Sequence, residues 1–244
     1  MNRMHHQGVR GLLFDLDGTL LDTLGDLLAS ANHALALEGL PLCSSDEIRP
    51  QISGGARSMI GYWITKRLED EEVRPYPAEY RLRPENQALL ERVIDRMLDH
   101  YEAFPATYTR FFEGMEEVLA YLDAKDMPWG IVTNKRTRFT TPIAMSFGLD
   151  TRTPCIVSGD TTPKAKPHPL PLIKAAELLG LAPHECVYMG DAERDIEAGK
   201  RAGMRTLAAG YGYIAPQDCP ENWGAEKILG RPADLIPWIE EYCR

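Results

Sequence analysis

The sequence predicts an α/β fold in which a doubly wound parallel sheet is interrupted by an all-helical insertion. Three observations predict it. Short apolar runs alternate with amphipathic segments after about residue 106, a similar apolar run stands alone at residues 9–14, and residues 22–105 show no strand pattern. Strands that alternate with helices favour a parallel sheet with helices on both faces. The first strand therefore belongs with the C-terminal part of the chain.

The strand expected at residues 9–14 is followed only by helical patterns up to about residue 104. These helices are expected at residues 24–37, 56–68 and 85–104. Asp22 or Thr23 is the expected N-cap of the first helix, because either side chain can accept a hydrogen bond from the first N–H groups. A polar stretch rich in charge and proline, residues 69–83, separates the second and third helices.

Strands and helices then alternate to the end of the chain. Strands are expected at residues 128–133, 155–158, 186–190 and 205–209, and helices at residues 113–125, 136–147, 169–179 and 193–202. A last strand–helix pair occupies about residues 226–241. We therefore expect two domains, an α/β core formed by residues 1–21 and 106–244, and a helical cap formed by residues 22–105. A core of this length is a normal size for one domain.

The composition argues against several classes of protein. Among 244 residues, 27 basic side chains face 36 acidic ones, a net charge of −9, whereas a nucleic-acid-binding surface needs a clustered positive field. The five cysteines include no C-x-x-C pair, which argues against a disulfide framework or a structural zinc site. No apolar run approaches the ~20 residues of a membrane span. The first ten residues are polar and lack the apolar core of a signal peptide. We expect a soluble cytoplasmic protein, monomeric or homodimeric, with no nucleic-acid or membrane partner.

Carboxylates follow two of the expected strands. Asp15 and Asp17 end the first strand, and Asp191 follows residues 186–190, with Asp195 four residues further on. The carboxyl ends of parallel strands meet at one edge of a sheet, where ligands bind. Carboxylates that converge there repel one another unless a cation lies among them. Hard oxygen ligands suit Mg²⁺, so the pattern predicts a magnesium site.

Groups suited to a phosphoryl group follow two further strands. Thr133 and Asn134 end the strand at 128–133, and Lys166 follows the strand at 155–158. A hydroxyl donor and a lysine cation suit phosphoryl oxygens. An aspartate can be the nucleophile in phosphoryl transfer, and a second carboxyl two residues on can do acid–base work. Each of these residues alone is common in turns or on protein surfaces, but together they indicate phosphoryl transfer.

Four motifs occur in an order that resembles the haloacid dehalogenase superfamily. They are Asp15-Leu16-Asp17-Gly18-Thr19, Thr133-Asn134, Lys166-Pro167-x-Pro169 and Gly190-Asp191-x-x-x-Asp195. The resemblance implies that Asp15 is the nucleophile, Asp17 the general acid/base and Lys166 a further catalytic residue. It also implies that Mg²⁺ binds the Asp15 carboxylate, the Asp17 main-chain carbonyl and Asp191, and that Thr133, Asn134 and Lys166 hold the phosphoryl group. Asp195 is expected to support the metal site, with a plain helix-surface residue as the alternative.

The second aspartate, Asp17, points to phosphate esters, since the dehalogenases of the superfamily lack it. Within the superfamily the chain resembles the phosphoglycolate phosphatase group, with Leu24-Gly25-Asp26 where Ala-Pro-Asp is common. It is similar to the N-acetylmuramic acid 6-phosphate phosphatases of bacterial wall recycling at residues 49–57, 112–115, 129–135, 211–214 and 222–225. The resemblance implies a phosphomonoester hydrolase for a small phosphorylated metabolite, with these two esters as candidate substrates. A sugar phosphomutase of the β-phosphoglucomutase type is the alternative, and a non-catalytic binding module on the same fold is a third possibility.

The loop at Ser53-Gly54-Gly55-Ala56-Arg57 lies between two expected cap helices. Its glycines can simply end one helix and start the next. Alternatively, Gly54 and Gly55 allow close approach to a ligand, and Arg57 binds a substrate carboxylate in a bidentate way. Both candidate esters carry a carboxylate, so Arg57 does not distinguish between them.

Overall fold

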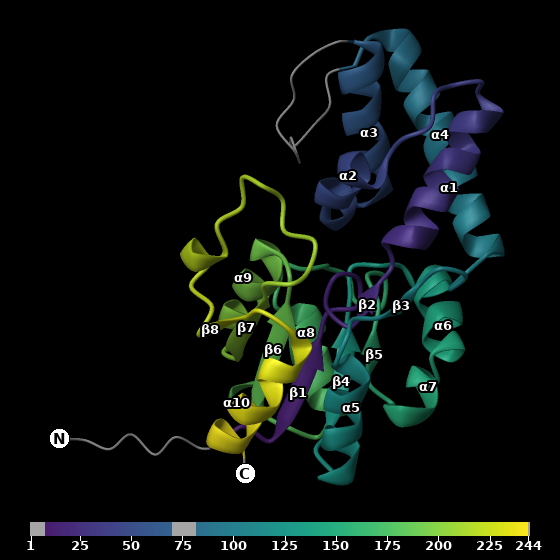
Figure 1. The fold of residues 1–244 in the computed structure, drawn as a ribbon. Coiled ribbons are helices and arrows are strands. Elements are labelled where there is room, and N and C mark those ends of the chain that lie inside the picture. The colour runs from purple at the N-terminus through teal and green to yellow at the C-terminus, as the bar shows by residue number, and fades with distance from the viewer. Residues whose placement is uncertain (1–7, 70–81, 244) are drawn as a thin grey trace. The chain divides into compact units, whose positions relative to one another are not determined.

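The computed structural model describes residues 8–69 and 82–243. The N-terminal tail and most of the polar stretch expected at 69–83 therefore lie outside the described residues. The expected parallel sheet is present, with six strands in the order β5-β4-β1-β6-β7-β8 (Figure 1). These strands are β1 (Gly11–Phe14), β4 (Trp129–Val132), β5 (Ile156–Val157), β6 (Cys186–Gly190), β7 (Arg205–Ala209) and β8 (Lys227–Leu229).

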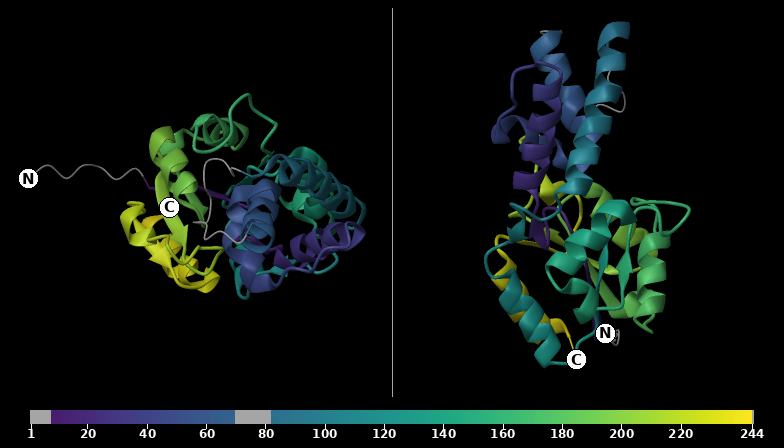
Figure 2. Two further views of the ribbon diagram at one scale, coloured as in Figure 1. Left: turned by 90° about the horizontal axis from the view of Figure 1, so that it is seen from above. Right: turned by 90° about the vertical axis from the view of Figure 1, so that its right-hand side faces the viewer.

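Two groups of helices cover the two faces of the sheet. The helices of this part are α5 (Met115–Ala124), α6 (Thr137–Ser146), α7 (Leu149–Arg152), α8 (Leu170–Leu178), α9 (Glu193–Ala202) and α10 (Leu235–Tyr242). Helices α8 and α9 contact each other and pack on β4, β5, β6 and β7, whereas α5 contacts α10 (Figure 2). Because both faces are covered, the central strands β1, β4 and β6 are buried throughout, which explains their continuous apolar sequences.

The register of the central strands aligns their carboxyl ends. Phe14, the last residue of β1, pairs with Ile131 of β4 and with Met189 of β6. The chain therefore leaves all three strands at the same edge of the sheet, and the residues that follow them are brought together by backbone geometry alone.

The insertion is helical, as the sequence predicts. It contains α1 (Leu24–Leu37), α2 (Ser45–Ile48), a 3₁₀ turn (Arg49–Gly54), α3 (Gly55–Leu68) and α4 (Pro84–Ala103). Helix α4 packs against α1 and α3. Two short strands, β2 (Leu21–Asp22) and β3 (Arg110–Phe111), pair where the chain enters and leaves the insertion. No helix in residues 8–69 and 82–243 is long and apolar enough to cross a bilayer.

The chain divides into two compact units, and one short segment joins the helical unit from far away in the sequence. The helical unit comprises Asp22–Arg110 together with Tyr213–Asp218, and the remaining residues form the α/β unit. The Tyr213 hydroxyl accepts hydrogen bonds from the Thr23 N–H at 2.6 Å and the Leu24 N–H at 2.9 Å, and it donates to Asp22 Oδ1 at 2.7 Å.

The start of α1 is therefore capped partly from a distance. Thr23 occupies the N-cap position but makes no side-chain capping hydrogen bond, and Asp22 Oδ1 accepts from the Leu24 N–H at 3.2 Å. The sequence offers Asp22 or Thr23 as the cap, and Thr23 occupies that position. It does not reveal that the Tyr213 hydroxyl supplies much of the hydrogen bonding.

Candidate active site

Three predicted site residues come directly after neighbouring strands of the α/β unit. Asp15 follows β1, Thr133 follows β4 and Asp191 follows β6, and β1 lies between the other two strands. Each of these side chains is buried, with exposed fractions of 3%, 3% and 1%. The edge of the sheet at which they lie is therefore an interior polar site rather than a solvated loop cluster.

Three carboxylates converge at this edge. One carboxylate oxygen from each of Asp15, Asp191 and Asp195 lies within 4.8 Å of the others, and all three residues are buried. Asp195 belongs to the first turn of α9, where its carboxylate accepts a hydrogen bond from the Ala192 N–H at 3.1 Å. The alternative that Asp195 is a surface residue of its helix is wrong, because its side chain has no exposed area.

Lys166 connects two of these carboxylates. Its ammonium nitrogen lies 3.0 Å from Asp15 Oδ1 and 2.8 Å from Asp195 Oδ1. The same nitrogen donates to the Val132 carbonyl at 2.8 Å and to the Tyr188 hydroxyl at 2.7 Å. A buried ammonium is costly unless it is paired and hydrogen-bonded, and these four contacts fix it beside the predicted nucleophile.

Tyr188 is a site residue that the sequence analysis did not identify. It lies in β6, is fully buried, and donates from its hydroxyl to the Val132 carbonyl at 2.9 Å while lying 3.3 Å from Asp195 Oδ1. A polar side chain inside an otherwise apolar buried strand, Cys-Val-Tyr-Met-Gly at residues 186–190, is the signal that could have revealed it.

Asn134 holds the main chain of Lys166 through both ends of its amide. Its Nδ2 donates to the Lys166 carbonyl and its Oδ1 accepts from the Lys166 N–H, each at 2.9 Å. This reciprocal pair fixes the loop that carries the lysine. The sequence predicts that Asn134 touches the phosphoryl group, and the structure shows a supporting contact instead; the direct role stays a prediction.

Asp17 pairs with a second lysine that the sequence analysis also did not identify. Lys135 Nζ lies 2.5 Å from Asp17 Oδ1. The two side chains are 9% and 19% exposed, so Asp17 lies closer to solvent than Asp15. Lys135 directly follows Thr133 and Asn134, and that adjacency was the available signal.

Burial and charge act together on the ionisation of the carboxylates. Burial raises the pKa of Asp15 to about 6; Lys166 opposes the rise, and the neighbouring negative charge of Asp195 adds to it. Burial also raises the pKa of Asp195, but Lys166 and Arg194 outweigh it and hold that pKa below its ordinary value. The Asp15 carboxylate is thus short of positive charge in the protein alone.

The donor set at this edge fits a magnesium ion. Mg²⁺ prefers carboxylate, carbonyl and water oxygens, and Asp15 and Asp191 offer buried carboxylates whose oxygens converge. A divalent cation would supply the positive charge that Asp15 lacks, because an opposite charge nearby favours the ionised form of a carboxyl group. The residues present therefore fit the predicted metal.

Glycines allow the chain to pass close to the carboxylates. A Cβ atom at Gly212 would lie 2.3 Å from the Asp191 Cβ and 2.4 Å from the Gly18 carbonyl oxygen. A Cβ atom at Gly190 would lie 2.4 Å from the Asp195 Cβ. Larger residues at either position would displace a carboxylate or the loop that carries Asp17.

The predicted substrate residues Gly54, Gly55 and Arg57 lie in the helical unit. Gly54 ends the 3₁₀ turn and Gly55 begins α3 with a φ of +75°, so these glycines do end one helical segment and start the next. The Arg57 guanidinium donates from Nη2 to both carboxylate oxygens of Glu91, at 2.8 and 2.6 Å. Both side chains of this pair are about half exposed.

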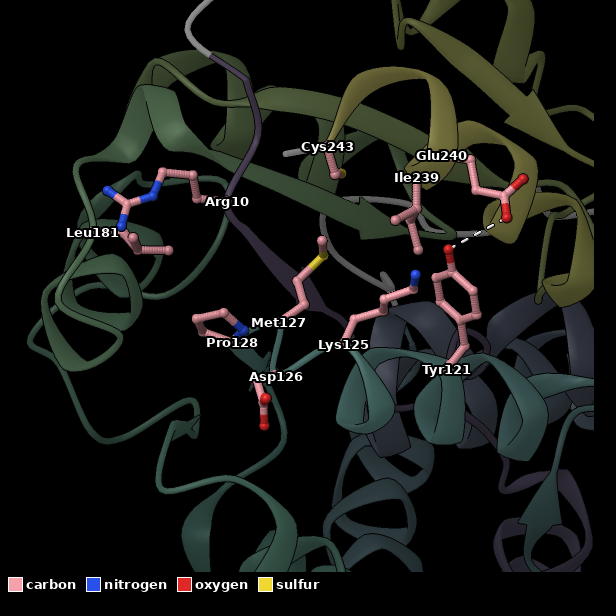
Figure 3. Close-up of a pocket in the computed structure, with 10 residues that line it drawn as sticks. All are labelled: Arg10, Tyr121, Lys125, Asp126, Met127, Pro128, Leu181, Ile239, Glu240 and Cys243. Atoms are coloured by element: carbon pink, nitrogen blue, oxygen red, sulfur yellow. Dashed lines mark hydrogen bonds between the residues drawn. The ribbon is translucent and has the colours of Figure 1, made fainter.

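A separate cavity of about 580 Å³ opens on the α/β unit (Figure 3). Its lining includes Arg10 and Pro128, which directly precede β1 and β4. It therefore lies at the amino ends of the strands, whereas Asp15 and Thr133 follow their carboxyl ends. None of the predicted catalytic residues lines it, so it is not the candidate active site.

Comparisons with known proteins agree with the geometry. The profile of the haloacid dehalogenase-like hydrolase family matches residues 12–209. An N-acetylmuramic acid 6-phosphate phosphatase of Pseudomonas putida is 41% identical over 95% of this chain and 96% of its own length. A phosphoglycolate phosphatase of Xanthomonas campestris pv. campestris is 37% identical over 93% of this chain and 94% of its own.

A solved structure extends this likeness to the fold. The crystal structure of a protein described as a predicted phosphoglycolate phosphatase, from Haemophilus somnus, has a TM-score of 0.78 and 27% identity, and the match covers 94% of this chain and 97% of that one. The motifs, the convergent site and these similarities agree. The chain therefore belongs to the haloacid dehalogenase-like hydrolases and, with its relatives, to the phosphatases among them.

Proposed function

We propose that the protein is a Mg²⁺-dependent phosphomonoester hydrolase that acts through an aspartyl-phosphate. The observation that carries the proposal is the placement of Asp15. Its buried carboxylate lies 3.0 Å from Lys166 Nζ and beside Asp191, and the second carboxyl needed for proton transfer follows at Asp17. Asp15 and Asp191, with the Asp17 main-chain carbonyl, would hold the metal, and Thr133 and Lys166 would face the phosphoryl oxygens.

The residues account for both halves of the reaction. A carboxylate oxygen of Asp15 attacks phosphorus in line, the bond from phosphorus to the ester oxygen breaks, and Asp17 gives its proton to the departing oxygen. Asp17 then takes a proton from a water molecule, which attacks phosphorus and releases phosphate and the Asp15 carboxylate. Mg²⁺, when bound, supplies positive charge to the phosphoryl oxygens in both halves.

N-acetylmuramic acid 6-phosphate is the first candidate substrate and phosphoglycolate the second. The support for this order is the identity of 41% to the relative named for the former and 37% to the relative named for the latter. If the first candidate is correct, the protein takes part in recycling of the bacterial cell wall. The phosphomutase alternative is not favoured, because the similar proteins compared above carry the names of phosphatases.

A phosphate-release assay tests the proposal. The purified protein is assayed with Mg²⁺ against N-acetylmuramic acid 6-phosphate, phosphoglycolate, pyrophosphate and p-nitrophenyl phosphate, and a hexose 1-phosphate is examined for the isomeric 6-phosphate. We expect the highest kcat/KM for N-acetylmuramic acid 6-phosphate. Conversion of the hexose phosphate without phosphate release would establish the mutase alternative instead. Hydrolysis confined to phosphoglycolate would reverse the order of candidates.

We propose Arg57 as the residue that recognises the part of the substrate beyond the phosphoryl group. A charge-assisted hydrogen bond is worth about 1.5–3 kcal/mol, so Arg57→Ala should lower kcat/KM for a carboxylate-bearing substrate by roughly 10- to 100-fold. Hydrolysis of p-nitrophenyl phosphate, which has no carboxylate, should change little.

Glu91 provides the matched control for Arg57. Glu91→Gln weakens the same exposed ion pair, which is worth only about 0–1 kcal/mol to stability, but leaves the guanidinium in place. We expect Glu91→Gln to retain activity on both esters. Equal losses in the two variants, on both esters, would show that the Arg57–Glu91 pair supports the fold of the helical unit and that Arg57 does not read substrate.

A further inference from the structure

The contact between Lys135 and Asp17 is the closest ion pair among the site residues described above. Lys135 Nζ lies 2.5 Å from Asp17 Oδ1, and only 9% of the lysine side chain is exposed. An ammonium with so little access to water depends on its partners for compensation. The pair is therefore a part of the interior of the site, unlike the exposed ion pairs on the helices.

The main chain of Lys135 is held on both sides. Its N–H donates to Thr133 Oγ1 at 3.1 Å, and its carbonyl accepts from the Gly159 N–H at 2.8 Å and from Thr140 Oγ1 at 3.2 Å. A Cβ atom at Gly159 would lie 2.2 Å from the Asn134 carbonyl oxygen, so this close approach requires glycine. The lysine consequently extends from a fixed base.

A fixed cation restricts the carboxylate that it contacts. An unrestrained aspartate side chain samples several rotamers, whereas proton transfer requires the carboxyl to lie within hydrogen-bond reach of the ester oxygen. Misplacing a catalytic group by ~1 Å can cost about 100-fold in rate. The partner that holds the Asp17 carboxylate in place is thus expected to influence proton transfer without itself exchanging the proton.

We propose that Lys135 is a positioning residue for Asp17, which holds the general acid/base in its reactive orientation. The inference rests on the proposed function, in which Asp17 protonates the departing oxygen. The competing role for Lys135 is direct binding of the phosphoryl group, for which Lys166, with its nitrogen 3.0 Å from Asp15 Oδ1, is the better placed lysine.

Substrates with different leaving groups separate the two roles. p-Nitrophenolate is a stable anion that departs with little need for a proton, whereas an alkoxide must be protonated as it leaves. We expect Lys135→Met to lower kcat/KM for N-acetylmuramic acid 6-phosphate or phosphoglycolate by roughly 10- to 100-fold, and that for p-nitrophenyl phosphate by less than about 3-fold. Lys135→Arg, which keeps the cation, should recover most of the loss.

The same assays contain the controls. Lys174→Met removes an exposed lysine that pairs with Glu177 at 2.9 Å in α8, and it should leave both rates unchanged. Thermal melting of each variant shows whether it is folded. Equal losses of kcat/KM on alkyl and aryl esters, or a rise in KM with unchanged kcat, would overturn the inference in favour of phosphoryl binding. If the wild-type protein hydrolyses no ester, it is the proposed function that fails.

Discussion

At Asp15, burial and neighbouring charge act in opposite directions on one carboxylate. Burial raises the pKa of this group to about 6, and Lys166 counteracts the rise. The same lysine is shared with Asp195, so it cannot fully compensate both anions. We interpret the remaining deficit of positive charge as the reason that the buried Asp15 carboxylate can bind a further cation.

Replacing Asp15 tests its proposed role as the nucleophile. Asp15→Asn keeps an oxygen that can accept from the Leu16 N–H, as Asp15 Oδ1 does at 2.8 Å, so the variant should fold. It removes the attacking carboxylate, and we expect phosphatase turnover to fall by at least about 1,000-fold, some 4 kcal/mol in the barrier. Asp150→Asn, an exposed position in α7, is the matched control. Turnover above about a tenth of wild type, a change of only ~1.4 kcal/mol, would contradict the nucleophile assignment.

The residues that the sequence identified and those that it missed differ in a physical way. Asp15 and Asp191 end strands whose apolar patterns and parallel pairing already fix where the backbone goes. The contacts of Lys135 and Tyr188 depend on where long side chains extend after the chain has folded. The local sequence does not predict the ion pair between Lys135 and Asp17, because 118 residues separate the two in the chain.

At the scale of elements, the first helix of the insertion is fixed at its start by distant groups. Besides the Tyr213 hydroxyl, the Asp26 carboxylate of α1 accepts hydrogen bonds from the N–H groups of Thr107, Tyr108 and Thr109, at 3.1, 2.8 and 2.9 Å. Periodicity predicted the helix and its bounds correctly. Periodicity could not predict that residues 213–218 pack with this unit, because that contact depends on the three-dimensional path of the chain.

Tyr213→Phe tests the role of the distant hydroxyl. Tyr213 is buried, and its loss leaves the N–H groups of Thr23 and Leu24 without this acceptor. An unsatisfied buried donor costs about 1–3 kcal/mol, so the free energy of unfolding should fall by roughly that amount in chemical denaturation. Tyr121→Phe, which loses a single hydroxyl contact with Glu240 at 3.4 Å on the surface, should change it by less than about 0.5 kcal/mol. Similar values for the two variants would show that Tyr213 does not cap α1.

At the scale of the whole molecule, a protein with a net charge of −9 must bind an anionic ester. Charges separated by more than about 8 Å in solution are largely screened at physiological ionic strength. The overall charge therefore matters less than Lys166, Lys135 and the metal that we propose the carboxylates to bind. The net charge argues against a nucleic-acid surface, but the sequence alone could not show how local cations offset that charge within the site.

Metal binding should consequently stabilise the folded protein as a whole. A ligand that binds only the folded state at 100 times its Kd adds about 2.7 kcal/mol of stability, and 1 kcal/mol shifts the Tm of a chain of 150–250 residues by about 2–4 °C. We expect saturating Mg²⁺ to raise the Tm of the metal-free protein by roughly 5–10 °C, and EDTA to reverse the rise and abolish hydrolysis.

Asp191→Asn separates binding at the predicted site from a general effect of the salt. This change removes one of the converging carboxylates, so the metal-free variant should melt no lower than metal-free wild type, because like charges that repel are reduced in number. The rise in Tm with Mg²⁺ should disappear in this variant and persist in Asp150→Asn. A rise of the same size in Asp191→Asn and wild type would mean that magnesium stabilises the protein elsewhere. The converging carboxylates of Asp15 and Asp191 would then not be the metal site, whatever the activity assay shows.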